Sequence, residues 1–174
     1  MRELIRLGAK ALATEVNDRQ ISLLLQYLGL LIEANKKTNL TAITDSDEII
    51  KKHFLDSMAA VMHLQSMKGA SKGIDVGSGP GLPGIPVKIL RSHDKMLMLD
   101  ATKKKVQFMN LAIDKLGLKD ISAVHVRAED LARLQQHRQA YDYALSRAVA
   151  PLKVLLELTL PFVRVGGVFI AYKS

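Results

Sequence analysis

The chain has 174 residues, a formal net charge of +8 and no cysteine. This length fits one domain of ordinary size, and the absence of cysteine excludes a disulfide scaffold and a thiolate nucleophile. A hydrophobic fraction of 48% excludes a disordered chain, and no apolar run reaches the ~20 residues that span a bilayer. Met1–Lys10 lacks the pattern of a secretion signal. We therefore expect a cytoplasmic protein that does not enter a membrane.

Positive charge is concentrated in the carboxy-terminal part of the chain. Of the 25 Lys and Arg residues, 16 follow Gly69, whereas only nine of the 17 Asp and Glu residues do. A basic surface attracts polyanions, because contacts with phosphates release counterions. The charge is consistent with a nucleic-acid partner and equally with a soluble protein that is merely basic.

The amino-terminal part, residues 1–70, has the periodicity of helices. Asn17 or Asp18 is placed to cap a helix that runs to about Asn35 and carries one broad apolar stripe. Asn39–Thr44 interrupts this periodicity. Asp45 and Glu48 then have the spacing of a capping box, and the second helix, which they open, ends near Gly69. We expect these helices to form a cap that belongs to the same domain as the rest of the chain.

The remaining residues, 71–174, alternate between strand and helix patterns. The predicted strands are 73–76, 96–99, 123–126, 143–145 and 168–172. The predicted helices are 85–91, 102–116, 129–135 and 151–162. Such alternation implies right-handed crossovers. The predicted fold class is therefore α/β, with a doubly wound, mainly parallel, Rossmann-like sheet, helices on both of its faces, and a helical cap before it.

A glycine-rich loop, Asp75–Gly84, directly follows the first predicted strand. Gly77, Gly79 and Gly81 remove Cβ atoms from one side of this turn, so that the backbone can approach a ligand closely. Asp75, at the end of the strand, is placed to reach a bound cation. Ligands of doubly wound sheets bind outside the carboxyl ends of the strands, which is where this loop begins.

The spacing of the loop differs from the dinucleotide fingerprint, which requires glycine where this chain has Leu82. Pro80 and Pro83 also remove amides that a pyrophosphate would bind. A nucleoside with a positively charged tail, such as S-adenosyl-L-methionine, fits the loop better. A glycine turn that binds no ligand is the alternative.

Acidic residues follow the next two predicted strands. Asp100 closes the second strand, a position from which a carboxylate accepts the hydroxyls of a ribose, although it is also placed to cap the following helix. After the third strand, Ala128 and Glu129 offer backbone and carboxylate groups to an adenine. Helix capping explains these two residues as well.

Seven segments in this order resemble one bacterial enzyme family. They are Asn39–Ile43, His53–Ser57, Asp75–Pro86, Asp100 with the basic helix after it, Arg127–Asp130, Ser146–Ala148, and Gly166–Gly167 leading to Tyr172–Lys173. The glycine loop alone is typical of class I S-adenosyl-L-methionine-dependent methyltransferases. With the other segments, the chain resembles the 16S ribosomal RNA guanine-N7 methyltransferase family, also called glucose-inhibited division protein B.

The resemblance implies methylation of a guanine N7 in the 530 loop of 16S ribosomal RNA, within the small ribosomal subunit. The cofactor contacts that it implies are Gly77, Leu82, Asp100, Ala128, Glu129 and Arg147. The family fold continues past its fifth strand into a further helix and a closing strand pair. Those elements are expected to be missing after Ser174: either the chain is shortened or this member lacks them.

The residues present fit this chemistry. Guanine N7 carries a free lone pair and no proton, so the transfer needs no general base. The five histidines are scattered without metal-ligand spacing, so we expect no metal site. The protein would then promote the reaction by positioning the two reactants. Arg147, after the fourth strand, is our candidate catalytic residue, which would hold the cofactor carboxylate or donate to guanine O6; a surface ion pair is the alternative.

Two groups of residues are candidates for RNA contact. Around the cap they are Asn39, His53, Asp56 and Ser57, although His53 and Asp56, three apart on one helix, could serve a structural hydrogen bond. In the core they are Lys103, Lys104, Lys105 and Lys173, and for the run of the first three a solvated charge run is the alternative. We expect a monomer that recognises folded RNA by shape and phosphate contacts.

Two other functions remain open from the residues alone. An NAD(P)-dependent oxidoreductase would share the order of strand, glycine loop and acidic residue. A non-catalytic RNA-binding or ribosome-assembly protein would share the fold and the charge. An Asp100→Ala change separates the second from an enzyme, because only a protein that holds a ribose there would lose cofactor affinity.

Overall fold

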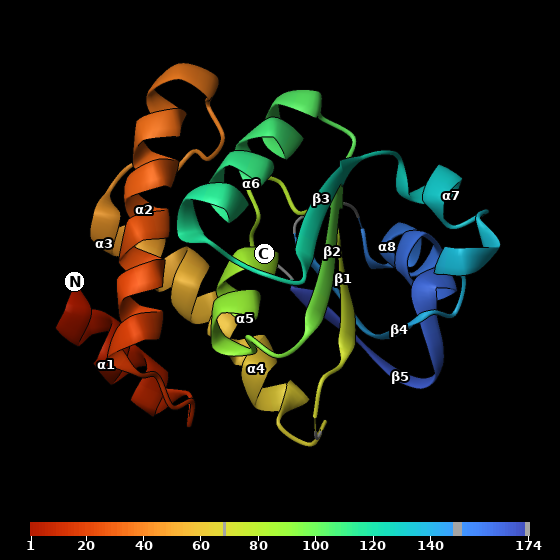
Figure 1. Cartoon of the computed structure of the whole chain (residues 1–174), viewed down its shortest axis with the longest axis horizontal. Coiled ribbons are helices and arrows are strands. Elements are labelled where there is room, and N and C mark those ends of the chain that lie inside the picture. Colours follow the sequence, from red (N-terminus) through yellow and green to blue (C-terminus); the bar gives the residue numbers. More distant parts are fainter. Residues whose placement is uncertain (68, 148–150, 173–174) are drawn as a thin grey trace.

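The computed structural model describes residues 1–67, 69–147 and 151–172 (Figure 1). Its helices are α1 (Arg2–Ala11), α2 (Asp18–Thr38), α3 (Ser46–Ile49), α4 (Asp56–Leu64), α5 (Gly84–Leu90), α6 (Lys103–Leu116), α7 (Ala128–Leu131) and α8 (Leu152–Thr159). A π-helical segment (Ile50–Leu55) joins α3 to α4, and 3₁₀ turns cover Gln135–His137 and Leu160–Phe162. The strands are β1 (Lys72–Val76), β2 (Lys95–Asp100), β3 (Ile121–His125), β4 (Tyr141–Arg147) and β5 (Val163–Tyr172). Within these ranges no helix is both long and apolar enough to cross a membrane.

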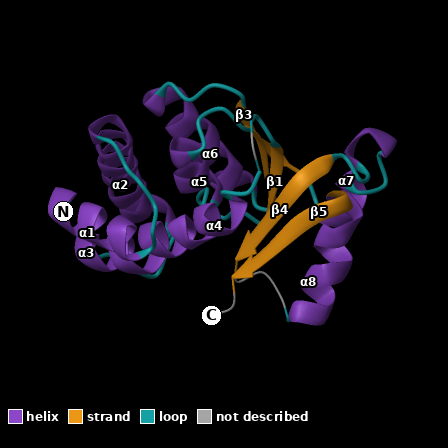
Figure 2. Cartoon of the chain, turned by 90° about the horizontal axis from the view of Figure 1, so that it is seen from below, coloured by secondary structure: helices purple, strands orange, loops and turns teal. Residues whose placement is uncertain are grey.

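The five strands form one sheet in the order β3-β2-β1-β4-β5, and all neighbouring pairs are parallel. The predicted α/β fold is thereby confirmed. Figure 2 shows α1 to α6 on one face of the sheet and α7 and α8 on the other. The carboxyl ends of β1, β2, β3 and β4 are therefore neighbours at one edge, where parallel sheets bind their ligands.

One apolar core joins the helical cap to the sheet. Ile21 and Leu24 of α2, Met109 of α6 and Tyr143 of β4 are fully buried members of the same cluster. A second cluster lies beneath α7 and α8 and includes Ile74 of β1. Alternate residues of the central strands thus fill opposite cores, as expected for a sheet that is covered on both faces.

The capping of the first long helix is stronger than predicted. The Asn17 side chain accepts from the Gln20 amide at 2.9 Å, and the Gln20 side chain accepts from the Asn17 amide at 2.9 Å. This is a complete capping box, whereas at the predicted one only the Asp45 half forms. Glu48 instead pairs with the Lys52 side chain, which follows it by one helical turn.

Several predicted core elements differ from the structure by one or two residues at their ends, and two differ more. The helix predicted at 129–135 is only α7, because Leu134 takes an extended conformation before the 3₁₀ turn. The last strand begins at Val163 rather than 168. Val163 pairs with Tyr141, and the register then shifts around Gly166, whose φ is +76°. Such an irregularity conceals the alternation by which a strand is recognised.

Candidate functional site

The predicted cofactor residues meet at the carboxyl edge of the sheet. The glycine loop leaves β1 and enters α5, Asp100 ends β2, and Arg147 ends β4. Because β2 and β4 flank β1, these three elements lie side by side. Ala128 and Glu129 open α7 after the neighbouring strand β3, Ala128 being buried and Glu129 exposed. The roles of these residues toward a ligand stay predictions.

The first half of the glycine loop is held by the end of β2. The amides of Gly77 and Ser78 both donate to the Leu99 carbonyl, at 2.9 and 3.0 Å. The amide of Gly79 donates to Oδ2 of Asp100 at 2.9 Å. One strand end therefore fixes three consecutive backbone donors of the loop.

The second half of the loop satisfies its own donors. The amides of Gly81 and Leu82 donate to the Ser78 carbonyl at 2.8 and 2.9 Å, and that of Gly84 donates to Oδ2 of Asp75 at 2.8 Å. The Ile85 amide donates to the Gly81 carbonyl. Since the two prolines carry no N–H, every amide of this fully described loop, residues 77–85, has a partner within the protein. A diphosphate would find no free donor here.

Two glycines show why the loop needs this residue type. Gly79 has a φ of +58°, and a Cβ atom on it would meet no atom within 4 Å, so the space over it is open. Gly81 has a φ of +103°, and its Cβ would lie 2.5 Å from Cδ1 of Ile85 and 3.3 Å from the Tyr27 hydroxyl. The loop is therefore open on one side and tightly packed on the other.

Asp75 lies deeper than its sequence position indicates. Its side chain is fully buried, Oδ2 accepts from the Gly84 amide, and Oδ1 has no hydrogen-bond partner among the described residues. Burial raises the pKa of this carboxyl to about 7, against hydrogen bonds from Ser78 and Gly84 and the charge of Arg147, which lower it. The carboxylate that we expected to reach a cation thus holds the start of α5, and direct contact with a ligand stays a prediction.

Asp100 holds the backbone before α6 and the glycine loop at the same time, and its contact with a ribose stays a prediction. Oδ1 accepts from the Thr102 amide at 2.7 Å, just before α6, and Oδ2 accepts from the Gly79 amide. Its side chain is 7% exposed. Each carboxylate oxygen can accept a further hydrogen bond, so the hydroxyls of a ribose remain chemically possible partners.

Arg147 is the shared positive charge of this site. Its Nη1 atom lies 3.4 Å from the Lys52 carbonyl and 3.4 Å from Oδ2 of Asp56. Burial raises the pKa of Asp75, Tyr27 and Tyr172 and lowers the pKa of His53. The charge of Arg147 lowers the pKa of all four groups. The guanidinium therefore connects the end of β4 to the π-helical segment of the cap.

The residues predicted around His53 are brought together. Nε2 of His53 lies 3.0 Å from Oγ1 of Thr41, and the Ser57 hydroxyl donates to the His53 carbonyl. Burial, and then the charge of Arg147, lower the pKa of His53 to about 4, so the imidazole is neutral at pH 7. The expected hydrogen bond between His53 and Asp56 is absent from this described segment, and Asp56 faces Arg147 instead. Asn39 lies at the end of α2, where it is the C-cap and has a left-handed backbone conformation.

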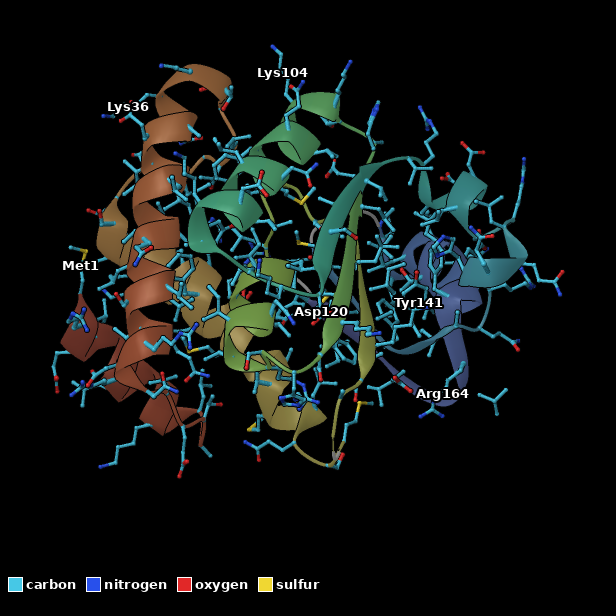
Figure 3. The ribbon with its side chains drawn as sticks, in the orientation of Figure 1. Met1, Lys36, Lys104, Asp120, Tyr141 and Arg164 are labelled. Carbon is cyan, nitrogen blue, oxygen red and sulfur yellow. The ribbon has the colours of Figure 1, made fainter. Side chains whose placement is uncertain are left out.

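The predicted basic residues take different places. Lys103, Lys104 and Lys105 open α6, and Figure 3 shows Lys104 at the same upper end of the view as Lys36 of α2. Two separate elements thus carry lysines toward one end of the molecule. Lys173 lies outside the described residues. Among the described side chains, no group of three or more His, Asp or Glu residues is placed to hold a metal ion.

Two tyrosines, Tyr27, which is buried, and Tyr172, which is partly buried, belong to this site and were not among the predicted site residues. The Tyr27 hydroxyl donates to the Pro80 carbonyl at 2.9 Å, and the Tyr172 hydroxyl donates to the Ser57 carbonyl at 3.1 Å. Tyr27 lies three residues after Leu24 on the apolar face of α2. A tyrosine in a buried stripe needs a partner for its hydroxyl, which is the signal that identifies such a residue.

Structures of known methyltransferases share the fold. A methyltransferase from Geobacter sulfurreducens, described as SAM-dependent and in complex with S-adenosyl-L-homocysteine, matches with a TM-score of 0.52 and 16% identity, over 67% of this chain and 47% of that one. Precorrin-6y C5,15-methyltransferase from Geobacter metallireducens matches with a TM-score of 0.51 and 14% identity, over 65% and 60% of the two chains. At these identities the likeness shows the fold alone.

Sequence comparisons are more specific. The family model GidB, rRNA small subunit methyltransferase G, matches residues 20–174. A ribosomal RNA small subunit methyltransferase G from Alkaliphilus metalliredigens is 46% identical over 167 residues, which are 96% of this chain and 70% of that protein. The protein of the same name from Clostridium botulinum, strain Loch Maree, is 48% identical over 160 residues, which are 92% of this chain and 66% of the relative. The chain thus spans about two thirds of the length of these relatives, and it belongs to the rRNA small subunit methyltransferase G (GidB) family.

Proposed function

We propose that this chain is an S-adenosyl-L-methionine-dependent methyltransferase that methylates N7 of a guanine in the 530 loop of 16S ribosomal RNA. The observation that carries the choice of cofactor is the glycine loop, in which every backbone amide is already occupied. Such a loop suits a nucleoside without phosphates and disfavours NAD(P). The open space over Gly79, next to Asp100, is where we assign the nucleoside.

The residues of the site fit a transfer that moves no proton. S-adenosyl-L-methionine would supply the methyl group from its sulfonium. The lone pair of guanine N7 would form the new carbon–nitrogen bond as the methyl carbon–sulfur bond breaks. The positive charge would pass from sulfur to the purine, and neutral S-adenosyl-L-homocysteine would leave. His53, neutral at pH 7 because its pKa is about 4, is not needed as a base. The protein then contributes orientation, which can account for ~7–11 kcal/mol of a barrier.

Arg147 is the group that we assign to orientation. Its guanidinium reaches from β4 toward the cap, and its side chain is 14% exposed, so it is shielded yet accessible to a ligand. Its two contacts are long, at 3.4 Å, and are open to exchange for a carboxylate. It would hold the carboxylate of the cofactor or donate to guanine O6. N7 itself must stay free of any donor, because its lone pair is the nucleophile.

Lysines on the surface are candidates for contact with the RNA substrate. Lys104 in the first turn of α6 and Lys36 in the last turn of α2 lie at one end of the molecule (Figure 3). We propose that the lysines of these two helix ends contact phosphates of 16S ribosomal RNA. The enzyme would act in the cytoplasm as a monomer, on RNA that is presented within the small subunit. A non-catalytic RNA-binding protein of the same fold is the second candidate, favoured by this charge alone.

Calorimetric titration with S-adenosyl-L-methionine, with NADH as the control ligand, tests the cofactor. We expect micromolar binding of S-adenosyl-L-methionine and none of NADH. Incubation of the chain with unmodified small subunits and labelled S-adenosyl-L-methionine then tests the reaction. The modified position is located because borohydride reduction and aniline treatment cleave an RNA strand selectively at N7-methylguanosine. Binding of subunits without any binding of S-adenosyl-L-methionine would favour the non-catalytic candidate.

A further inference from the structure

A cavity of about 670 Å³ lies in the helical cap, outside the carboxyl edge of the sheet. It is formed by the last turns of α2, the loop 39–44 and α3, and its lining includes Ile32, Asn35, Lys36, Asn39, Ile43 and Ile49. The cofactor residues of β1, β2 and β4 do not line it. It is therefore a separate cavity that the methyl-transfer site does not account for.

The loop over this cavity is held in a fixed shape. The Asn35 amide group donates to the Thr41 carbonyl at 2.9 Å, and its oxygen accepts from the Thr41 amide at 2.9 Å. The Ile43 amide donates to Oγ1 of Thr41 at 3.2 Å. These bonds are made by Asn35 and Thr41, whereas Ala42, which also lines the cavity, is exposed at its rim. A loop that is fixed on its inner side and open on its outer side is organised for binding before a ligand arrives.

The lining suits a nucleotide. Ile32, Ile43 and Ile49 give aliphatic walls, on which the face of a base can lie. Asn39 gives an exposed amide at the rim, which makes no side-chain hydrogen bond within the described ranges and can donate to or accept from a base edge. Lys36 supplies a cation for a phosphate. It is paired with Glu33 at 2.9 Å, but both side chains are about two-thirds exposed, and such pairs are weak enough to exchange.

The cavity is connected to the methyl-transfer site through His53. Thr41, in the wall of the cavity, lies 3.0 Å from Nε2 of His53. Nδ1 of His53 lies 3.2 Å from the Lys52 carbonyl, and Nη1 of Arg147 lies 3.4 Å from the same carbonyl. A ligand in the cavity and a base at Arg147 would thus lie on two sides of one imidazole.

We propose that this cavity is a second nucleotide site, which holds a nucleotide near the target guanine in the same RNA strand. The inference rests on the proposed function in that it takes RNA as the substrate. Sequence-specific proteins recognise RNA mainly at loops whose bases are splayed out, and an enzyme that extrudes one base must accommodate its neighbours. The cavity accommodates such a neighbour without using any residue of the cofactor site.

The test is an Ala42→Trp variant, in which an indole occupies the cavity from its exposed rim. Ala11→Trp, at an exposed position at the end of α1, is the matched control. We expect Ala42→Trp to raise KM for unmodified small subunits about tenfold, as for loss of one stacked base, with kcat and the Kd for S-adenosyl-L-methionine unchanged. A KM equal to that of Ala11→Trp would overturn the proposal.

A second measurement separates this inference from the proposed function. Adenosine, guanosine, cytidine and uridine 5′-monophosphates are titrated into isotopically labelled protein, and amide shifts are followed at Asn39, Thr41 and Ile43. We expect at least one of them to shift these amides in the wild-type chain and in Ala11→Trp but not in Ala42→Trp. Shifts that persist in Ala42→Trp, or none in the wild-type chain, would overturn the nucleotide site. Failure of the proposed function would appear instead as absent binding of S-adenosyl-L-methionine, with these shifts unaffected.

Discussion

The hydroxyl of Tyr27 donates a hydrogen bond of 2.9 Å to the carbonyl of Pro80. Tyr27 belongs to α2 of the cap, whereas Pro80 is at the centre of the glycine loop. The tyrosine ring is fully buried and stacks on Phe54, in the π-helical segment, with ring centroids 5.5 Å apart. The cap is therefore joined to the loop by a contact that positions the loop from outside the sheet.

A Tyr27→Phe substitution removes this hydroxyl and leaves the Pro80 carbonyl without its partner. We expect the free energy of unfolding to fall by ~1 kcal/mol and the affinity for S-adenosyl-L-methionine to fall severalfold. Urea unfolding and calorimetry measure the two effects. Tyr141→Phe is the matched control, because Tyr141 pairs with His137 at 2.6 Å in the other core. Equal loss of cofactor affinity in both variants would contradict a specific role for Tyr27.

Asp100 holds Gly79 and Thr102 at once, so its substitutions separate two effects. Asp100→Ala removes both acceptors, and we expect a loss of cofactor affinity of at least tenfold, or ~1.4 kcal/mol. Asp100→Asn retains one oxygen, and we expect a smaller loss. Calorimetric Kd values for S-adenosyl-L-methionine provide the measurement. Unchanged affinity in Asp100→Ala would exclude both a ribose contact and a positioning role for this carboxylate.

Arg147→Lys keeps the charge but loses the planar fork that binds a carboxylate through two hydrogen bonds. We expect methylation of small subunits to fall about 100-fold, in line with the ~2.7 kcal/mol that two decades of rate represent. Stability should change little, because the contacts of Arg147 are long at 3.4 Å. Arg164→Lys, which alters the exposed pair with Asp142, is the control. Full activity of Arg147→Lys would show that a point charge is sufficient.

Asp75 makes stability depend on pH in a defined direction. Its pKa is raised by burial from 3.8 to about 7, so the folded state binds more protons than the unfolded state between these values. Its contribution to stability is complete below pH 4 and is lost as the pH rises to 7. His53, with its pKa lowered to about 4, acts in the opposite direction between pH 4 and 6.5.

Comparison of the wild-type chain with Asp75→Asn isolates the first effect. We expect the difference in unfolding free energy to shift in favour of the variant between pH 4.5 and 7, on the order of 1 kcal/mol per pH unit. Urea titrations at several pH values measure this difference. A difference that does not vary with pH would mean that Asp75 has the same pKa in both states.

The sequence predicted the sheet and its carboxyl edge well, because strand and helix lengths alternate clearly after residue 71. It did not predict the π-helical segment Ile50–Leu55, since the apolar spacing there continues that of an ordinary helix. The contact of Arg147 with Asp56 joins residues 91 positions apart, and no local pattern encodes it. Tyr27 was missed for the same reason: its partner lies 53 residues further along the chain.

The occupied amides of the glycine loop have a consequence for competition inside a cell. ATP and the nicotinamide dinucleotides contain the same adenosine as S-adenosyl-L-methionine, and they are abundant. They differ by their phosphates, which most nucleotide sites anchor through free backbone N–H groups. A loop whose donors are bound to Leu99, Ser78 and two carboxylates offers phosphates no such anchor and sets acidic side chains near them. We therefore expect the hydrogen bonds that fold the loop also to disfavour binding of these phosphorylated nucleotides.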